Sequence, residues 1–199
     1  MSKLTRFILD FFACFLIPAY TLLFAGSVQW FGTNFSVIAV TGPDHYRGFI
    51  YWGVLAGGYF LVVLTALTRR LPLRWARWTV RLLTVSAVLA LAYALAIPYL
   101  PQYFPRYAAL HVLLAASACV LLMLALLLVI LTLRRRDPVR YGRALRGWWL
   151  IAAGSGVLFL IPRMVSSALE VFFTITAALL ARRLALLSKP ALDKPGSGA

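Results

Sequence analysis

Apolar runs of about twenty residues recur along this chain, and they constrain its fold more than any other feature. A helix needs roughly 20 apolar residues to cross the hydrocarbon core of a bilayer. Six such runs cover residues 7–25, 49–67, 79–97, 108–133, 145–161 and 165–186. A single helix over residues 148–187 would be about 60 Å long, twice the thickness of that core, so we expect a hairpin that turns at Pro162-Arg163. The runs predict an all-α fold, a polytopic membrane bundle of six transmembrane helices.

Composition supports a membrane protein and predicts the domain organisation. The chain is 63% hydrophobic and 13% charged, whereas soluble domains are about half apolar and about a quarter charged. We therefore expect residues 1–187 to form a single six-helix transmembrane domain. Residues 188–199 are polar, contain Lys189-Pro190 and Lys194-Pro195, and end in Gly-Ser-Gly-Ala. This composition predicts a disordered cytoplasmic tail.

The distribution of basic residues predicts the orientation of the six helices. Seventeen of the 20 lysines and arginines fall near the N-terminus, within 69–81, within 134–146 or after residue 181. The other three are Arg47, Arg106 and Arg163, which lie in the alternate set of loops. Loops rich in lysine and arginine stay on the cytoplasmic side. Both termini are therefore predicted to be cytoplasmic, in a multi-pass protein of the cell membrane, with the bacterial cytoplasmic membrane favoured.

The net charge of +15 indicates a partner of opposite charge. In a soluble protein it would suggest nucleic acid, but here the basic residues sit in short clusters between apolar runs, so we expect no nucleic acid. Such clusters attract anionic lipids of the inner leaflet at about 1 kcal/mol per basic residue. The predicted lipid contacts are Arg69, Arg70, Arg134, Arg135 and Arg136.

The last apolar run contains a carboxylate, Glu170. At helical spacing, Glu170 shares one face with Ser167, Thr174, Ala177 and Ala181. Membrane helices turn small and polar faces toward neighbouring helices rather than toward lipid. An ionisable residue within a membrane span is costly, so Glu170 is the first candidate for a functional site.

The other rare polar residues are predicted to gather near Glu170, on the outer side. His111 lies about one turn into the fourth run, at a depth similar to that of Glu170. The candidate ligand-binding residues are Glu170, His111, Arg163, Asp44, His45 and Arg47. A carboxylate, an imidazole and a guanidinium together can bind a lipid headgroup or transfer protons, and they can equally form an ion pair that fixes helix packing. On the inner side, Asp10 is one turn from Arg6, which predicts a local ion pair.

Motifs for metal binding and nucleophilic catalysis are absent from the sequence. His45, His111 and Glu170 are acceptable zinc or iron ligands by type. No two of them have the spacing of helical ligands, and no HExxH occurs, so we predict no metal and no cofactor. Without a GxSxG motif we predict no catalytic residue, and interpret Gly154-Ser155-Gly156 as packing. Gly53-x-x-x-Gly57 permits close helix approach, and packing within the monomer is favoured over an oligomer.

Three features of the sequence together resemble a known family. They are a long first outer loop with Asn34-Phe-Ser-Val-Ile-Ala-Val-Thr-Gly-Pro-Asp44, His111 at the head of the fourth run, and Ser167-Ala168-Leu169-Glu170 in the sixth. The chain thereby resembles the six-span DRAM-like family of autophagy modulators with their FRAG/Sfk relatives, and the related bacterial six-span domain of unknown function. The resemblance implies a role in membrane lipid organisation or signalling, without an agreed catalytic chemistry.

The sequence as a whole predicts a non-enzymatic membrane protein that binds a lipid or another amphiphile at a polar site at its outer mouth. Two alternatives stay open. One is a small proton-coupled transporter that uses Glu170. The other is an intramembrane hydrolase that uses His111 and Glu170.

Overall fold

The computed structural model of the chain describes residues 3–26 and 29–188, and every regular element in those ranges is helical. The elements are α1 (Lys3–Phe11), η1 (Phe12–Leu16), α2 (Ile17–Ala25), α3 (Phe35–Ala39), α4 (Pro43–Thr68), α5 (Arg74–Ala96), α6 (Pro105–Arg134), α7 (Pro138–Leu160) and α8 (Ser167–Leu187). The all-α prediction is therefore confirmed. The tail predicted to be disordered lies outside the described residues except for Ser188, which ends α8 and accepts hydrogen bonds from Arg70.

Most of the long helices begin before the apolar runs that predicted them, because turn residues rather than hydropathy fix where a helix starts. Pro43, Pro105 and Pro138 stand in the first turns of α4, α6 and α7. Proline is favoured there because its φ is helical and its missing N–H would have no partner within the helix. Asp137 and Ser166 cap α7 and α8 by accepting backbone N–H bonds from Arg140 and Leu169.

The first crossing is one continuous helix with a single π-helical turn, η1, between α1 and α2. Pro18 is the second residue after this turn. Proline inside a helix removes a hydrogen bond and clashes with the preceding turn, and a π-turn is one way in which a helix absorbs such an irregularity. The chain therefore stays helical from Lys3 to Ala25.

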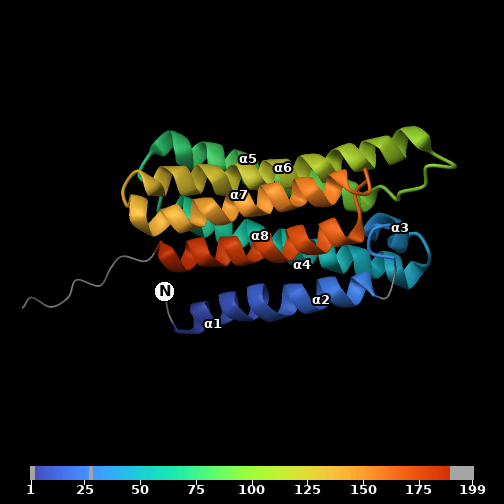
Figure 1. Cartoon of the computed structure of the whole chain (residues 1–199), viewed down its shortest axis with the longest axis horizontal. Helices are drawn as coiled ribbons and strands as arrows, with labels where there is room; N and C mark the ends of the chain where they lie inside the picture. Colours follow the sequence, from blue (N-terminus) through green and yellow to red (C-terminus); the bar gives the residue numbers. More distant parts are fainter. Residues whose placement is uncertain (1–2, 27–28, 189–199) are drawn as a thin grey trace, which may run out of the picture.

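Five helices form a closed ring in which each packs against the next, in the order α4, α5, α6, α7, α8 and back to α4. The first helix lies outside this ring, where α2 packs against both α4 and α8. Figure 1 shows that α1 begins and α8 ends at the same end of the bundle, while α3 covers the opposite end. We call these the arginine end and the α3 end, since the loops at 69–73 and 135–137 lie at the former.

The two ends are packed differently. Toward the arginine end, a large buried cluster fills the ring with branched side chains, among them Leu64, Val80, Leu126, Val129, Ile130 and Leu184. Toward the α3 end, a separate and smaller cluster joins α2, α3, α4, α5 and α8. The ring is thus solid in one half, and the cavity described below occupies part of the other.

Two glycines of α4 allow it to approach α5 closely. A methyl group at Gly53 would overlap the side chain of Leu95, and one at Gly57 would lie 3.1 Å from Leu91. The small face of α4 is therefore covered by α5 of the same chain, which agrees with the interpretation of Gly53 and Gly57 as packing within the monomer.

Four helices are long and apolar enough to cross a membrane, judged by length and composition: Lys3–Ala25, Pro43–Thr68, Arg74–Ala96 and Pro105–Arg134. The two remaining ring helices carry more charge. Three arginines lie in the first half of α7, and α8 contains Glu170, Arg182 and Arg183. Because of these charges, neither α7 nor α8 is as apolar over the length of a membrane span as the four helices named above.

Candidate functional site

The α3 end is built by the first loop folding over the start of α8. The backbone N–H groups of Ser167 and Ala168 donate to the carbonyl oxygens of Thr33 and Trp30, over 2.7 and 2.9 Å. A helix leaves its first N–H groups without partners inside the helix. The loop thus supplies the acceptors that α8 needs at its N-terminus.

Asn34 fixes the short helix α3 in this position. Its side-chain oxygen accepts from the Val37 backbone N–H, as an N-cap does. Its amide nitrogen donates to the Val165 carbonyl, which ties α3 to the turn before α8.

Phe35 anchors α3 in a group of aromatic rings. Its side chain is fully buried, and its ring meets Phe24 edge to face at 5.1 Å and Trp52 at 5.0 Å between centroids. Phe49 completes the group by stacking on Trp52. Edge-to-face pairs contribute about 0.5–1.5 kcal/mol beyond the area that they bury. The first loop is therefore packed onto the end of the bundle by α3.

Neighbouring residues of α3 contact the two principal predicted site residues. The Phe35 backbone N–H donates to Oε2 of Glu170 over 2.6 Å. The Ser36 hydroxyl lies 2.7 Å from Nε2 of His111. Glu170 and His111 are not bonded to each other, but each is held by α3 through adjacent residues. The structure therefore brings them to one place.

The hydrogen bonds of His111 determine its tautomer. Nδ1 lies 2.8 Å from the carbonyl oxygens of both Ala94 and Ile97, at the end of α5. Carbonyls only accept, so Nδ1 carries a hydrogen. In the neutral ring Nε2 is then an acceptor, and it receives the Ser36 hydroxyl hydrogen. Both ring nitrogens are occupied, and His111 joins α5, α6 and α3.

A cavity of about 610 Å³ lies inside the ring and is lined by residues from α4, α5, α6, α7 and α8 and from the α3 segment. Its wall is mainly aliphatic and aromatic, and includes Phe60, Val88, Leu91, Val112, Phe159 and Phe173. Asn34, Ser36, His111 and Glu170 contribute polar groups where α3 covers the ring. This volume falls in the range of about 300–1,000 Å³ that is typical of small-molecule sites.

Several residues that line the cavity have large accessible surface, so the space is not sealed on all sides. These residues are Val112, Ala116, Cys119, Val120 and Leu124 of α6, with Gly156 and Phe159 of α7. The solid half of the bundle closes the cavity toward the arginine end.

Glu170 turns toward this interior rather than away from the bundle. Ser167, Thr174, Ala177 and Ala181, which were predicted to share its face, are all buried. The expectation that this stripe faces neighbouring helices is confirmed. Within residues 3–26 and 29–188, no ion pair joins Glu170 to a basic side chain.

Four of the predicted site residues lie elsewhere, which corrects the proposed constellation. Asp44 and Arg47 form an exposed ion pair of 3.5 Å in the first turns of α4, and His45 contacts the Thr41 hydroxyl there. Arg163 is exposed in the turn between α7 and α8, with a left-handed φ of 53°. Water stabilises the charged groups of Asp44, Arg47 and Arg163 at these exposed positions. Residues 44–47 lie in the first turns of α4 because that helix begins at Pro43 rather than inside the apolar run.

His45, His111 and Glu170, the metal-ligand candidates, are likewise not gathered. Among the described residues, no group of three or more His, Cys, Asp or Glu side chains is placed to hold a metal ion.

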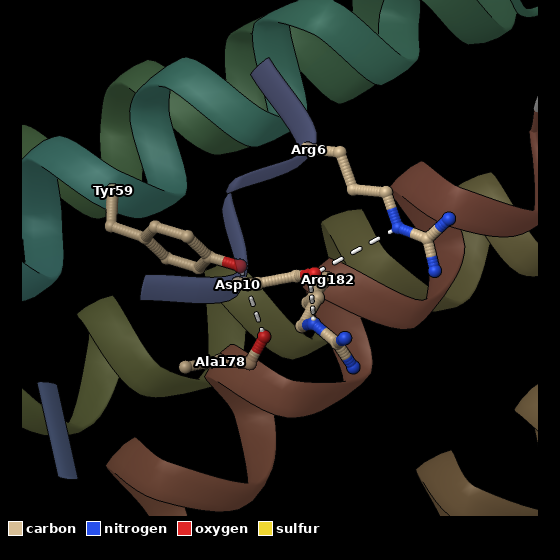
Figure 2. Close-up of polar contacts among 5 residues, drawn as sticks. All are labelled: Arg6, Asp10, Tyr59, Ala178 and Arg182. Atoms are coloured by element: carbon tan, nitrogen blue, oxygen red, sulfur yellow. Dashed lines mark hydrogen bonds and ion pairs between the residues drawn. The ribbon is translucent and has the colours of Figure 1, made fainter. Parts of the chain in front are cut away.

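Asp10 has a stronger partner than its predicted neighbour on the same helix. Arg6 approaches Asp10 at 3.8 Å as predicted, but Arg182 of α8 donates from Nε to Oδ1 of Asp10 over 2.7 Å. Figure 2 shows Asp10 between the two arginines, with the Tyr59 hydroxyl donating to the Ala178 carbonyl beside them. This cluster holds the first helix against α8.

Three residues of the site were missed by sequence reasoning. Ser36 and the backbone of Phe35 could have been suspected from Asn34, because Asn followed by an apolar run is typical of a helix start. Ser155 was interpreted as packing, yet it lines the cavity and its hydroxyl is buried without a hydrogen-bond partner.

Comparisons with models of protein families, with curated proteins and with solved structures return no match for this chain. The resemblance to six-span DRAM-like proteins therefore remains a prediction, and the function has to be argued from the site itself.

Proposed function

We propose that this chain is an integral membrane protein of six spans that binds an amphiphile in its central cavity. The number of spans is supported by the place of α7 and α8 in the ring. At 1.5 Å per residue, helices of 23 and 21 residues are about 30–35 Å long, enough for a bilayer core. The arginine-rich loops then face the cytoplasm together with both termini, and the membrane is the cell membrane.

One observation carries the proposed binding function. An apolar cavity inside a ring of membrane helices has its polar groups concentrated at one end, under α3. An amphiphile fits this arrangement, because its alkyl part can lie along aliphatic walls while its polar part meets Glu170.

Binding is preferred to transport because the cavity reaches only one end. A transporter needs a path that opens alternately to both sides, and the solid half separates the cavity from the arginine end. Hydrolysis is the weaker alternative because the Ser36 hydroxyl and His111, although within hydrogen-bond distance, are both almost entirely buried where α3 packs against α5 and α6.

The arginine end supports the second predicted partner, anionic lipid. Arg69, Arg134, Arg135 and Arg136 are exposed there. Arg70 is partly engaged, because it donates to Ser188 at the end of α8. We propose that the exposed four contact lipid headgroups of the inner leaflet.

The binding function is tested with the full chain in detergent micelles and a twelve-carbon alcohol that carries bromine at its far end. Bromine quenches tryptophan fluorescence at short range, and Trp52 and Trp148 both line the cavity. We expect saturable quenching. Filling the cavity with Ala115→Leu and Ala152→Leu together should weaken binding at least tenfold.

The matched control is Leu89→Phe, which enlarges an exposed side chain of α5 that lies outside the cavity. It should leave the quenching curve unchanged. Equal binding by the filled variant and the native chain, with both folded, would contradict the proposed function.

A further inference from the structure

The polar groups of the cavity differ in whether the protein itself satisfies them. Asn34 bonds to Val37 and Val165, and Ser36 and His111 bond to each other. Thr84 donates to the Val80 carbonyl. These groups are saturated by the fold and leave little for a ligand to bond.

Glu170 and Thr174 retain unused hydrogen-bonding capacity in the wall. Glu170 uses Oε2 for the Phe35 N–H, and no hydrogen bond reaches Oε1 from the described residues. The Thr174 side chain lines the cavity and takes part in none of the hydrogen bonds of the described residues. Both offer an oxygen acceptor. The Ser155 hydroxyl also has no partner, but its oxygen is buried away from the open space.

Glu170 and Thr174 lie close together on α8. Thr174 follows Glu170 by one helical turn, so both project from the same side of the helix, and both line the cavity.

Glu170 is also without a counter-ion. Its side chain has one strong N–H donor, and no basic residue among the described ranges pairs with it. A carboxylate removed from water without a compensating charge is costly. Arg163, the nearest arginine along the chain, is exposed in the turn instead.

We propose that the cavity binds amphiphiles whose polar end is a protonated amine, with the ammonium group against Glu170 and Thr174. This inference rests on the proposed amphiphile-binding function and specifies its ligand class. An alkylammonium has three N–H donors and no acceptor, which suits a site whose unused groups are oxygen acceptors. Its positive charge supplies the missing counter-ion, and its chain follows the apolar wall.

The same geometry disfavours other headgroups. A carboxylate or phosphate would place like charge beside Glu170, which raises the cost of binding. An alcohol of equal chain length would fill the apolar wall equally well, but it would supply one donor and no charge. Discrimination between amine and alcohol therefore isolates the proposed contact.

The experiment compares a bromine-terminated twelve-carbon amine with the alcohol and the carboxylic acid of the same length, by tryptophan quenching of the full chain at neutral pH. We expect the amine to bind at least tenfold more tightly than the alcohol, and the acid to bind more weakly than both. Glu170→Gln keeps an acceptor but carries no charge, so it should reduce the tenfold preference for the amine over the alcohol to about one.

One further variant keeps the test valid if Glu170→Gln does not fold. Thr174→Val removes one acceptor and should lower the preference for amine over alcohol by about threefold. Equal affinity of the native chain for amine and alcohol would overturn the amine inference and leave the binding function standing. If none of the three compounds binds, both the amine inference and the proposed binding function are overturned.

Discussion

The two halves of α6 differ in side-chain size, and the difference explains where the cavity lies. Toward the arginine end, Leu126, Val129 and Ile130 are completely buried and fill the ring. Toward the α3 end, the corresponding wall contains Ala115, Ala116 and Ala118 with His111 above them. One continuous helix therefore packs solidly where its side chains are large and branched, and borders a space where they are small.

Removing side-chain volume from the solid half should cause the largest loss of stability. Leu126→Ala should lower the free energy of unfolding by about 2–5 kcal/mol, since it leaves a cavity among fully buried neighbours. Leu124→Ala on the same helix changes a side chain that is 43% exposed and should cost about 1 kcal/mol or less. Denaturant titration in detergent measures both, and equal losses would refute the division into halves.

Enlarging a small side chain should destabilise the solid half but not the half that contains the cavity. Ala125 is fully buried in the solid half, so Ala125→Leu should cost about 1–3 kcal/mol through overpacking. Ala115→Leu projects into the cavity and should change the unfolding free energy by less than about 0.5 kcal/mol. If thermal unfolding shifts equally for both variants, the space beside Ala115 is not available as described.

Ser36→Ala tests the polar contacts that α3 makes at the end of the bundle containing the cavity. This change leaves Nε2 of buried His111 without its donor and should cost about 1–3 kcal/mol. Thr41→Ala removes a hydroxyl contact of the same 2.7 Å length to exposed His45. Because water replaces that contact, its cost should stay within about 0.5 kcal/mol. A smaller loss for Ser36→Ala than for Thr41→Ala would contradict the structural role of His111.

The smallest effect concerns the attachment of the first helix to the solid half. Arg182→Gln should cost roughly 1 kcal/mol, because the pair with Asp10 is short but about a third of the Asp10 side chain is exposed. Arg6→Gln removes a longer and more exposed contact and should be nearly neutral. Unfolding titrations that rank Arg6 above Arg182 would show that the local pair dominates.

The long apolar runs were sufficient to predict every long helix, because their length and composition reflect a bilayer rather than specific packing. The same pattern placed Glu170, Thr174 and their stripe toward other helices. Asp44, His45 and Arg47 were misplaced because hydropathy locates where a helix enters lipid, while Pro43 decides where it begins. The contacts of Phe35 and Ser36 join residues more than seventy positions apart, and no local pattern contains such pairings.

The way in which residues 29–39 hold α8 bears on the order of assembly during synthesis. The carbonyl oxygens of Trp30 and Thr33 and the N–H of Phe35 bond to groups of α8, which is synthesised after the other helices of the ring. These contacts of an early segment can therefore form only once α8 has been made. A chain halted before residue 167 would lack the backbone hydrogen bonds that hold residues 29–39 over the cavity.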